Sequence, residues 1–450
     1  MKKTNTSLIK ELKSPVLVVS KIMQTSAFQY FFTKISQSGF LLIGSAVIAL
    51  IWSNLNPEGY SHFWHQELAI HLGNLSLSHS LLHWINDGLM TLFFFTVGLE
   101  IKRELLVGGL SDPKRAALPV AAAIGGMVLP ALIYFYFNQG TDSLSGWGIP
   151  MATDIAFSLA VLSLLGRKIP FGIRLFLTAF AIVDDLGAIL VIALFYTASI
   201  NLYALAAAAV ICCLLFTINK AGVRKTLPYA ILGLMLWFAI SSAGLHATIA
   251  GVVTAMFIPC KGKYDTDIFL EMVQRRLDRI ECHGDSCGQS ILVNQRHLDA
   301  VQDINLACSE VETPLQRLEH SLSSWVGYLI LPLFALSNGG VSLAGMEPLT
   351  ALTNPVTQGI IFGLVLGKPL GIFIFTFTIA KILRTELMQG TTWIQILGAG
   401  LLGGIGFTMS LFISNLSFNS GIMLEYAKVG IMIGSFISAA LGYALLRWGK

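Results

Sequence analysis

Residues 175–197 read LFLTAFAIVDDLGAILVIALFYT, an apolar run with two adjacent aspartates, Asp184 and Asp185, near its middle. A helix needs roughly 20 mainly apolar residues to cross a bilayer, and this run meets that length. An ionisable side chain at the centre of a span costs about 3 kcal/mol or more, so it is first interpreted as functional. The stretch therefore predicts a membrane helix with a buried, functional carboxylate pair.

The composition of the whole chain agrees with a membrane location. Of its 450 residues, 54% are apolar and 12% are charged, and the charged share is roughly half that of a soluble domain. We therefore predict an all-α, polytopic membrane protein surrounded by the lipid bilayer, without a cofactor or a nucleic-acid partner. Apolar runs predict twelve transmembrane helices, near residues 38–54, 82–100, 117–137, 147–165, 173–197, 202–218, 227–243, 246–259, 324–343, 356–380, 392–415 and 426–446.

The predicted orientation rests on the positions of lysine and arginine. If the N-terminus is cytoplasmic, these residues fall in inner segments or at their edges, except for Lys368 and Lys428. This distribution follows the positive-inside rule, so we predict that both termini are cytoplasmic. The predicted organisation is a cytoplasmic N-terminal arm (1–37), spans 1–8 (38–259), a cytoplasmic loop (260–323), spans 9–12 (324–446) and a cytoplasmic C-terminus (447–450).

Two segments outside the predicted spans have patterns of their own. Apolar and other residues alternate on both sides of Gly73-Asn74, which predicts a short external β-hairpin over about residues 66–78. The alternative is an irregular loop. A lone hairpin is marginally stable in water, so we expect it to pack on something, such as a second protomer. In the inner loop, apolar spacing predicts two amphipathic helices, near residues 268–278 and 291–307.

The chemistry of Asp184 and Asp185 favours ion exchange. Adjacent residues on a helix point about 100° apart, so the two carboxylates face different surroundings. Two close carboxylates repel each other in a low dielectric, which favours a proton on one of them. Their oxygens also suit a hard cation such as Na⁺. Cation and proton would compete for the same oxygens, which is the minimal chemistry of an antiporter.

Other unusual residues lie inside the predicted spans. Pro150 and Thr153 precede Asp154 in GIPMATDIAFSLAVL (148–162), which suggests a broken helix whose free N–H groups Asp154 would neutralise. The Thr153 hydroxyl or carbonyl could reach a cation. Asp154 as a simple helix cap is the alternative, and both interpretations can hold. Lys368 must pair or lose its proton when buried, and the carboxylates of the membrane core are its expected partners.

A second break is predicted in LGAGLLGGIGFTMSLFI (397–413), the span richest in glycine. Two weak segments in corresponding positions of two halves indicate an inverted repeat with the site between them, here spans 3–5 with spans 10–12.

Two charged groups lie at inner ends of spans. Glu100, Arg103 and Glu104 follow the second span, where such clusters commonly mark the point at which a helix meets water. Glu319 and His320 come just before the ninth span. Histidine titrates near neutral pH, so these two residues could together gate access by pH.

At this point the motifs match a family: the chain resembles the NhaA-type bacterial sodium/proton antiporters. The matching stretches keep their order and spacing over most of residues 38–446, apart from the inner loop. They are INDGLMTLFFFTVGLEIKREL (85–105), AAAIGGMVLPAL (121–132), MATDIAFSLAVLSLLG (151–166), FLTAFAIVDDLGAILVIALFYT (176–197), GLHATIAGV (244–252), RLEHSLSSWVGYLILPLFALSNGGVSL (317–343), GKPLGI (367–372) and GIGFTMSLFI (404–413).

The resemblance implies a fold and an activity. It implies twelve spans in the bacterial inner membrane, with two discontinuous helices that cross at mid-membrane. It also implies electrogenic, pH-regulated export of Na⁺ or Li⁺ in exchange for protons, by alternating access. The β-hairpin maps to the family's dimer contact, so a homodimer is expected.

The resemblance also implies roles for residues. Asp185 becomes the principal cation ligand and Asp184 its partner in ion and proton exchange. Lys368 becomes the salt-bridge or proton-carrying partner of Asp184. Asp154 and Lys368 balance the dipoles of the broken helices, with Thr153 near the Na⁺ ion. The residues that map to the family's inner pH-sensing region are Glu100, Arg103, Glu104, Glu319 and His320.

Two departures from the family concern the pH response. The inner loop is longer than expected, and Ser323 stands one turn after His320, where some relatives have a second histidine. These differences leave the exchange chemistry unchanged.

Competing hypotheses use the same buried charges. A cation-coupled symporter or a channel could also be built from broken helices. An intramembrane aspartyl protease could use Asp154 with Asp184 or Asp185, but the sequence lacks a GxGD context and Lys368 would have no role. We therefore expect a transporter and not an enzyme.

Overall fold

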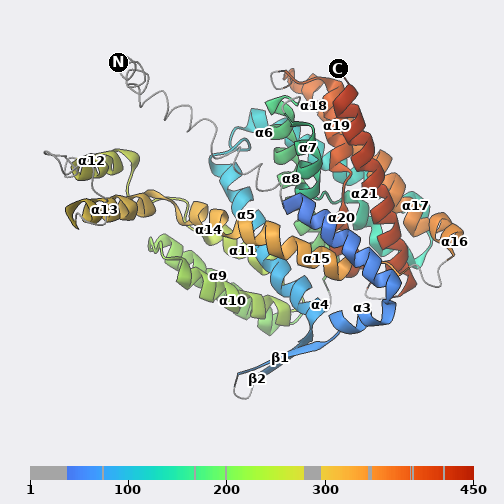
Figure 1. The fold of residues 1–450 in the computed structure, drawn as a ribbon, viewed down its shortest axis with the longest axis horizontal. Coiled ribbons are helices and arrows are strands. Elements are labelled where there is room, and N and C mark those ends of the chain that lie inside the picture. Colours follow the sequence, from blue (N-terminus) through green and yellow to red (C-terminus); the bar gives the residue numbers. More distant parts are fainter. Residues whose placement is uncertain are drawn as a thin grey trace, which may run out of the picture. The chain divides into compact units, whose positions relative to one another are not determined.

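The computed structural model describes residues 38–72, 75–166, 169–197, 200–277, 295–342, 347–385, 387, 390–418 and 421–449. These residues are mainly helical, with one two-stranded sheet (Figure 1). The chain forms two compact units. One consists of the described residues within 1–66, 117–184 and 327–450, and the other of those within 67–116 and 185–326. The predicted N-terminal arm lies outside the described residues.

The helices follow one another in chain order. In the first half they are Ser38–Leu55, α3 (Pro57–Trp64), α4 (Leu81–His83), η1 (Trp84–Leu89), α5 (Met90–Leu106), α6 (Pro113–Asn138), η2 (Asp142–Met151), α7 (Ile155–Leu164), α8 (Phe171–Phe195), α9 (Leu202–Lys220), α10 (Thr226–Ser242) and α11 (Ile249–Phe257). In the second half they are α12 (Thr266–Leu277), α13 (Gln295–Val311), α14 (Pro314–Trp325), η7 (Val326–Ile330), α15 (Leu331–Asn338), α16 (Pro348–Thr353), α17 (Pro355–Phe362), η8 (Gly363–Gly367), α18 (Lys368–Leu383), α19 (Trp393–Gly403), α20 (Phe407–Ser417) and α21 (Ile422–Trp448). Here η2 is a 3-10 helix, and η1, η7 and η8 are π-helical turns.

Several of these helices suit a bilayer. Seven of those described are long and apolar enough to cross a membrane, or nine if two bent pairs each count as one span. The bent pairs are η2 with α7, at 43°, and α19 with α20, at 45°. Each predicted span coincides with one to three consecutive helical segments, but α11 has only 9 residues. A membrane-spanning helix needs about 20 residues, so the count of twelve remains a prediction.

Each compact unit has its own apolar core. In the first unit the core includes Phe176, Phe180, Ile372 and Leu402, from α8, α18 and α19. Its helices approach closely through small residues, since a Cβ added to Gly125 on α6 would lie 2.2 Å from a carbonyl oxygen on α18. Such close approach is typical of helix packing in membranes.

The core of the second unit is built from α5, α9, α10 and α11. It includes Leu99, Leu215, Leu236 and Ala255, all fully buried. The helices of this unit are thus held together by apolar packing.

The predicted hairpin is confirmed. Strands β1 (Glu67–Leu72) and β2 (Leu75–Ser80) pair antiparallel, with Glu67 opposite Ser80 and Leu72 opposite Leu75. The indole N–H of Trp84 donates to Leu68 O at 3.1 Å, which ties the sheet to the start of η1. The turn at Gly73-Asn74 lies outside the described residues.

The predicted inner loop is more helical than a solvated connection. It contains α12 and α13, close to the two amphipathic helices predicted there, and Arg276 Nη1 lies 2.6 Å from Asp303 Oδ2 between them. The next helix begins at Pro314 and not near residue 324. Thr313 explains the earlier start, because its side chain accepts from Gln316 N–H while the Gln316 side chain accepts from Thr313 N–H. This capping box starts a helix whose first turns are polar.

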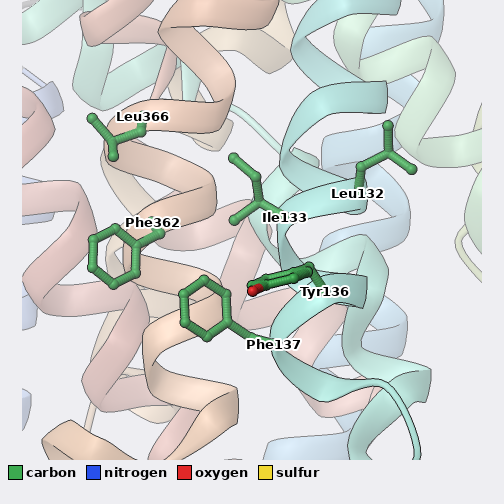
Figure 2. A pocket seen from close by; sticks show the side chains of 6 residues that line it. All are labelled: Leu132, Ile133, Tyr136, Phe137, Phe362 and Leu366. Carbon is green, nitrogen blue, oxygen red and sulfur yellow. The ribbon is translucent and has the colours of Figure 1, made fainter.

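An apolar groove of about 330 Å³ lies on the first unit, along α6 and the α17–η8 segment (Figure 2). Phe137 and Phe362 stack there, with ring centroids 5.4 Å apart. The residues that line the groove are Leu132, Ile133, Tyr136, Phe137, Phe362 and Leu366. None of these carries a charge.

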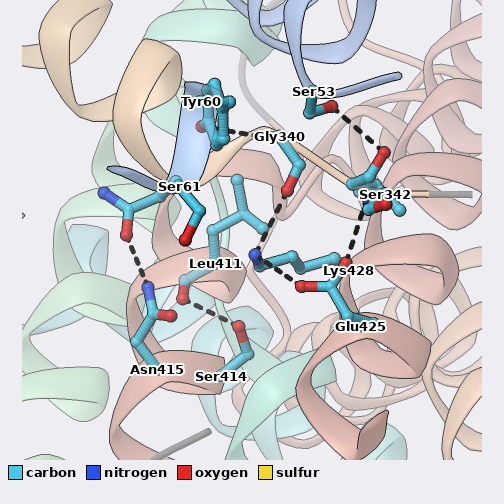
Figure 3. Close-up of polar contacts among 12 residues, drawn as sticks. Ser53, Tyr60, Ser61, Gly340, Ser342, Leu411, Ser414, Asn415, Glu425 and Lys428 are labelled. Carbon is cyan, nitrogen blue, oxygen red and sulfur yellow. Dashed lines mark hydrogen bonds and ion pairs between the residues drawn. The ribbon is translucent and has the colours of Figure 1, made fainter. Parts of the chain in front are cut away.

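Lys428, one of the two lysines outside the positive-inside pattern, belongs to a polar cluster at the start of α21 (Figure 3). Its Nζ donates to Glu425 Oε1 at 3.0 Å and to Gly340 O at 3.1 Å. Glu425 Oε2 accepts from Ser342 N–H, and Tyr60 Oη accepts from Gly340 N–H. The ion pair therefore fixes the segment after α15.

Candidate functional site

The centre of the first unit is a buried ion pair. Lys368 Nζ lies 2.7 Å from Asp184 Oδ2, and both side chains are 0% exposed. The ammonium also donates to Met151 O. Oδ1 of Asp184 makes no hydrogen bond with any residue that the structure describes. The contact agrees with the predicted pairing of Lys368 with Asp184, whose roles in transport remain predictions.

A π-helical turn, η8, aims Lys368 at this carboxylate. The N–H of Lys368 donates to Gly363 O, five residues earlier, in place of the four of an α-helix. Such a turn holds one extra residue and is frequent at functional sites. Pro369 follows and has no N–H to donate.

Asp154 lies in the break between η2 and α7. It is 1% exposed and caps α7, because its Oδ1 accepts from Phe157 N–H at 2.9 Å. Its Oδ2 accepts from the N–H and hydroxyl of Thr408, at 3.0 and 2.5 Å, in the first turn of α20. One carboxylate therefore caps two helices, at the positive end of each dipole. The same contacts therefore fit both predicted interpretations of Asp154, as a helix cap and as a charge that would neutralise helix dipoles.

Further hydrogen bonds join the two breaks. Asp154 N–H donates to Ile405 O at 2.7 Å, and the Thr153 hydroxyl donates to Gly403 O at 2.8 Å. The Ser158 hydroxyl donates to Leu402 O at 2.7 Å. Backbone groups that the breaks free are thus satisfied inside the protein, as they must be where water is absent.

Asp185 follows directly on α8 and is 1% exposed. Its role as a cation ligand stays a prediction.

The second unit brings together four of the five residues predicted to sense pH. The guanidinium of Arg103 donates to Glu319 Oε1, and its Nη2 lies 3.2 Å from Glu104 Oε1. Glu100 interacts electrostatically with all three. The fifth residue, His320, is exposed on α14 and acts electrostatically on Glu319. The cluster holds three acids and one arginine.

Thr408 was not predicted as a site residue, although two of its groups bind Asp154. A signal was present in GIGFTMSLFI, since a hydroxyl residue two positions after the last glycine of the break lies in the first turn of the next helix, where it can meet a charge. Only the contact between the two segments reveals the partner.

Membrane-length helices, a buried ion pair and two hydrogen-bonded helix breaks define a polytopic membrane protein with a charged centre, the class to which ion transporters belong. The family model of Na⁺/H⁺ antiporter 1 matches residues 29–446. A Na⁺/H⁺ antiporter NhaA of Wolinella succinogenes is 46% identical over 409 residues, covering 91% of this chain and 90% of the relative.

Other relatives agree. The Na⁺/H⁺ antiporter NhaA of Oleidesulfovibrio alaskensis is 44% identical over 423 residues, 93% of each chain. That of Helicobacter pylori is 44% identical over 412 residues, 90% of this chain and 92% of the relative. The chain therefore belongs to the Na⁺/H⁺ antiporter 1 family, and the resemblance drawn from its motifs is confirmed. It is a multi-pass protein of a bacterial membrane, and the names of its family and of these relatives are those of antiporters and not of enzymes.

Proposed function

We propose that this sodium/proton antiporter exports Na⁺ or Li⁺ by alternating access, with cation and protons competing for the carboxylates of Asp184 and Asp185. The buried contact between Lys368 Nζ and Asp184 Oδ2, at 2.7 Å, carries the proposal. Removing one partner from a buried pair leaves an uncompensated charge, which is strongly unfavourable. The state of the ammonium is therefore tied to the state of the carboxylate.

The proposed cycle follows from this charge balance. When Na⁺ binds, Asp185 is its principal ligand, with oxygens of Asp184 and Thr153 beside it. Na⁺ displaces the proton that Asp185 carries, and the Lys368 ammonium then leaves Asp184 and gives up a second proton. When Na⁺ departs, protons return and Lys368 pairs with Asp184 again. Asp154 stays bound to the two helix starts throughout and balances their positive ends, while Lys368, as long as it is charged, balances the negative end of η2 through Met151 O.

The exchange is electrogenic in this proposal, because more protons enter than Na⁺ ions leave in each cycle. One net charge that crosses 100 mV contributes about 2.3 kcal/mol. The membrane potential would thus drive export together with the proton gradient.

The membrane arrangement that we propose has twelve spans, two of them discontinuous, in the bacterial inner membrane with both termini cytoplasmic. The bends of 43° and 45° support the discontinuous spans. Each bent pair lies between two longer helical segments, α6 and α8 in one case and α17–α18 and α21 in the other. This common order supports an inverted repeat of spans 3–5 with spans 10–12.

Regulation by pH is proposed for the cluster of Glu100, Arg103, Glu104 and Glu319, with His320 beside it. Three acids that share one guanidinium cannot all carry a full charge at equal cost, so their protonation is coupled. A change in proton number would alter the ion pairs that link α5 to α14.

A homodimer through the hairpin is proposed as the assembly. Two antiparallel strands alone are marginally stable, and each strand has an edge free of a third strand in the described sheet. Replacing residues 67–80 by a short flexible linker should leave Na⁺/H⁺ exchange in place and halve the mass of the protein measured in detergent. An unchanged mass would remove this role.

The exchange mechanism is tested in proteoliposomes that carry a pH-sensitive dye. Added Na⁺ should move protons in the opposite direction, and the same direction would indicate a symporter. A steady Na⁺ current without a proton gradient would indicate a channel. Asp185→Asn, Asp184→Asn and Lys368→Met are compared with Asp142→Asn, which alters an exposed aspartate. Full exchange by Asp185→Asn would refute the assignment of the cation ligand.

A further inference from the structure

The π-helical turn before Lys368 leaves one backbone carbonyl without a helical donor. Lys368 N–H donates to Gly363 O, so the next bond in this pattern would run from residue 369 to Leu364 O. Residue 369 is proline and has no N–H. Leu364 is fully buried, and a buried carbonyl without a partner is costly.

A serine on α21 supplies the missing donor. The Ser438 hydroxyl donates to Leu364 O at 3.3 Å, and Ser438 is 0% exposed. The site is closed on its other side by the end of α19, because a Cβ on Gly404 would lie 2.4 Å from Leu364 O and 2.8 Å from Ser438 Oγ. The hydroxyl is therefore held against this carbonyl.

A second serine, one turn earlier on α21, holds the break that faces Asp154. Ser435 is 4% exposed, and its hydroxyl oxygen accepts from Gly406 N–H at 3.2 Å. Gly406 directly precedes α20, whose first turn contains Thr408, the partner of Asp154. The two serines thus bind one backbone group from each segment that carries a charged contact.

We propose that Ser435 and Ser438 are positioning residues for transport, which fix the Lys368 turn and the α19–α20 break on one rigid helix. The inference rests on the proposed function, because it assigns the serines through Lys368 and Asp154. Ser438 sets the direction of the Lys368 ammonium. Ser435 sets the start of α20. Neither serine is proposed to touch the ion.

The test measures the apparent Km for Na⁺, the maximal rate and the pH profile of exchange in proteoliposomes. Ser438→Ala should raise the apparent Km about three- to tenfold, the range expected for one lost buried hydrogen bond, and should shift the pH profile. Its maximal rate should stay within about twofold of the wild type. Ser435→Ala should behave similarly.

Ser414→Ala is the matched control. Ser414 is also 0% exposed, but its hydroxyl donates within its own helix, to Leu411 O at 2.8 Å. The truncation is the same and no second segment is released. This variant should therefore keep both the apparent Km and the pH profile of the wild type.

A rescue separates positioning from general destabilisation. Pro369→Ala restores the N–H that Leu364 O lacks, so adding it to Ser438→Ala should return the apparent Km to that of Pro369→Ala alone. If the double variant stays as impaired as Ser438→Ala, or if Ser438→Ala matches Ser414→Ala, the inference is wrong.

Lys368→Met in the same assay distinguishes the two levels of failure. If it changes the apparent Km and the pH profile while Ser438→Ala changes neither, only the positioning role fails. If Lys368→Met changes neither property, the proposed function fails first.

Discussion

Replacing Asp154 with alanine removes three hydrogen bonds from one buried side chain. Its carboxylate accepts from Phe157 N–H and from the N–H and hydroxyl of Thr408. Each lost N-cap costs about 1 kcal/mol, and the buried hydroxyl left without its partner costs at least as much again. We therefore expect Asp154→Ala to lower the free energy of unfolding by about 3 kcal/mol. Asp154→Asn keeps one oxygen for Phe157, so about half of that loss is expected.

The measurement is unfolding by SDS titration in mixed micelles, followed by tryptophan fluorescence. Asp142→Ala is the control, since Asp142 is an exposed aspartate at the start of η2 whose loss should change stability by less than about 0.5 kcal/mol. The predicted order of stability is wild type, Asn variant, Ala variant. If Asp154→Ala were no less stable than Asp142→Ala, the capping of α7 and α20 by Asp154 would not stabilise the protein, and the role given to Asp154 at the two breaks would be refuted.

Three further outcomes can be measured. Lys368→Met should lower the free energy of unfolding by about 3–5 kcal/mol, because it leaves the Asp184 carboxylate buried without its partner charge. Adding Asp184→Asn removes that charge and should restore part of the stability. A double variant less stable than the single one would contradict the pairing. Gly125→Ala should destabilise by about 1–3 kcal/mol because its Cβ would meet a backbone oxygen at 2.2 Å. Gly44→Ala should instead stabilise by about 0.5–1 kcal/mol, since a Cβ there meets no atom within 4 Å; equal effects would argue against close helix packing. Glu319→Gln leaves the Arg103 guanidinium less neutralised, so neighbouring groups should lose their protons at lower pH. If exchange starts when these groups lose protons, it should then start at lower pH. An unchanged pH profile would remove this cluster from regulation.

The buried ion pair could be predicted because charges are rare in the apolar runs. Lys368 is one of very few charges in these runs, which restricted its partner to a carboxylate of the membrane core, and the family resemblance selected Asp184. The breaks were also visible, through Pro150 in the first segment and the glycines around Gly404 in the second. In both cases the residues that interrupt a helix are the ones that leave a mark in the sequence.

Other features depend on contacts between distant segments. Thr408 lies 254 residues from Asp154, and nothing local shows that a second helix start shares the same carboxylate. The π-helical turn before Lys368 changes the register by one residue without changing hydropathy. The start of α14 has a capping box in the sequence, but its polar first turns resemble a loop.

The double cap at Asp154 also limits how this protein can be recombined. Relatives about 44% identical invite chimeras in which one membrane segment is exchanged for another. One such chimera takes residues 142–164 from a relative and keeps residues 393–417 of this chain. The carboxylate that caps α20 would then come from a different protein than α20 itself, and the two would no longer be matched in geometry. Exchanging both segments together should give a folded transporter more often than exchanging either alone, because both helix starts then keep the carboxylate that binds them in the same protein.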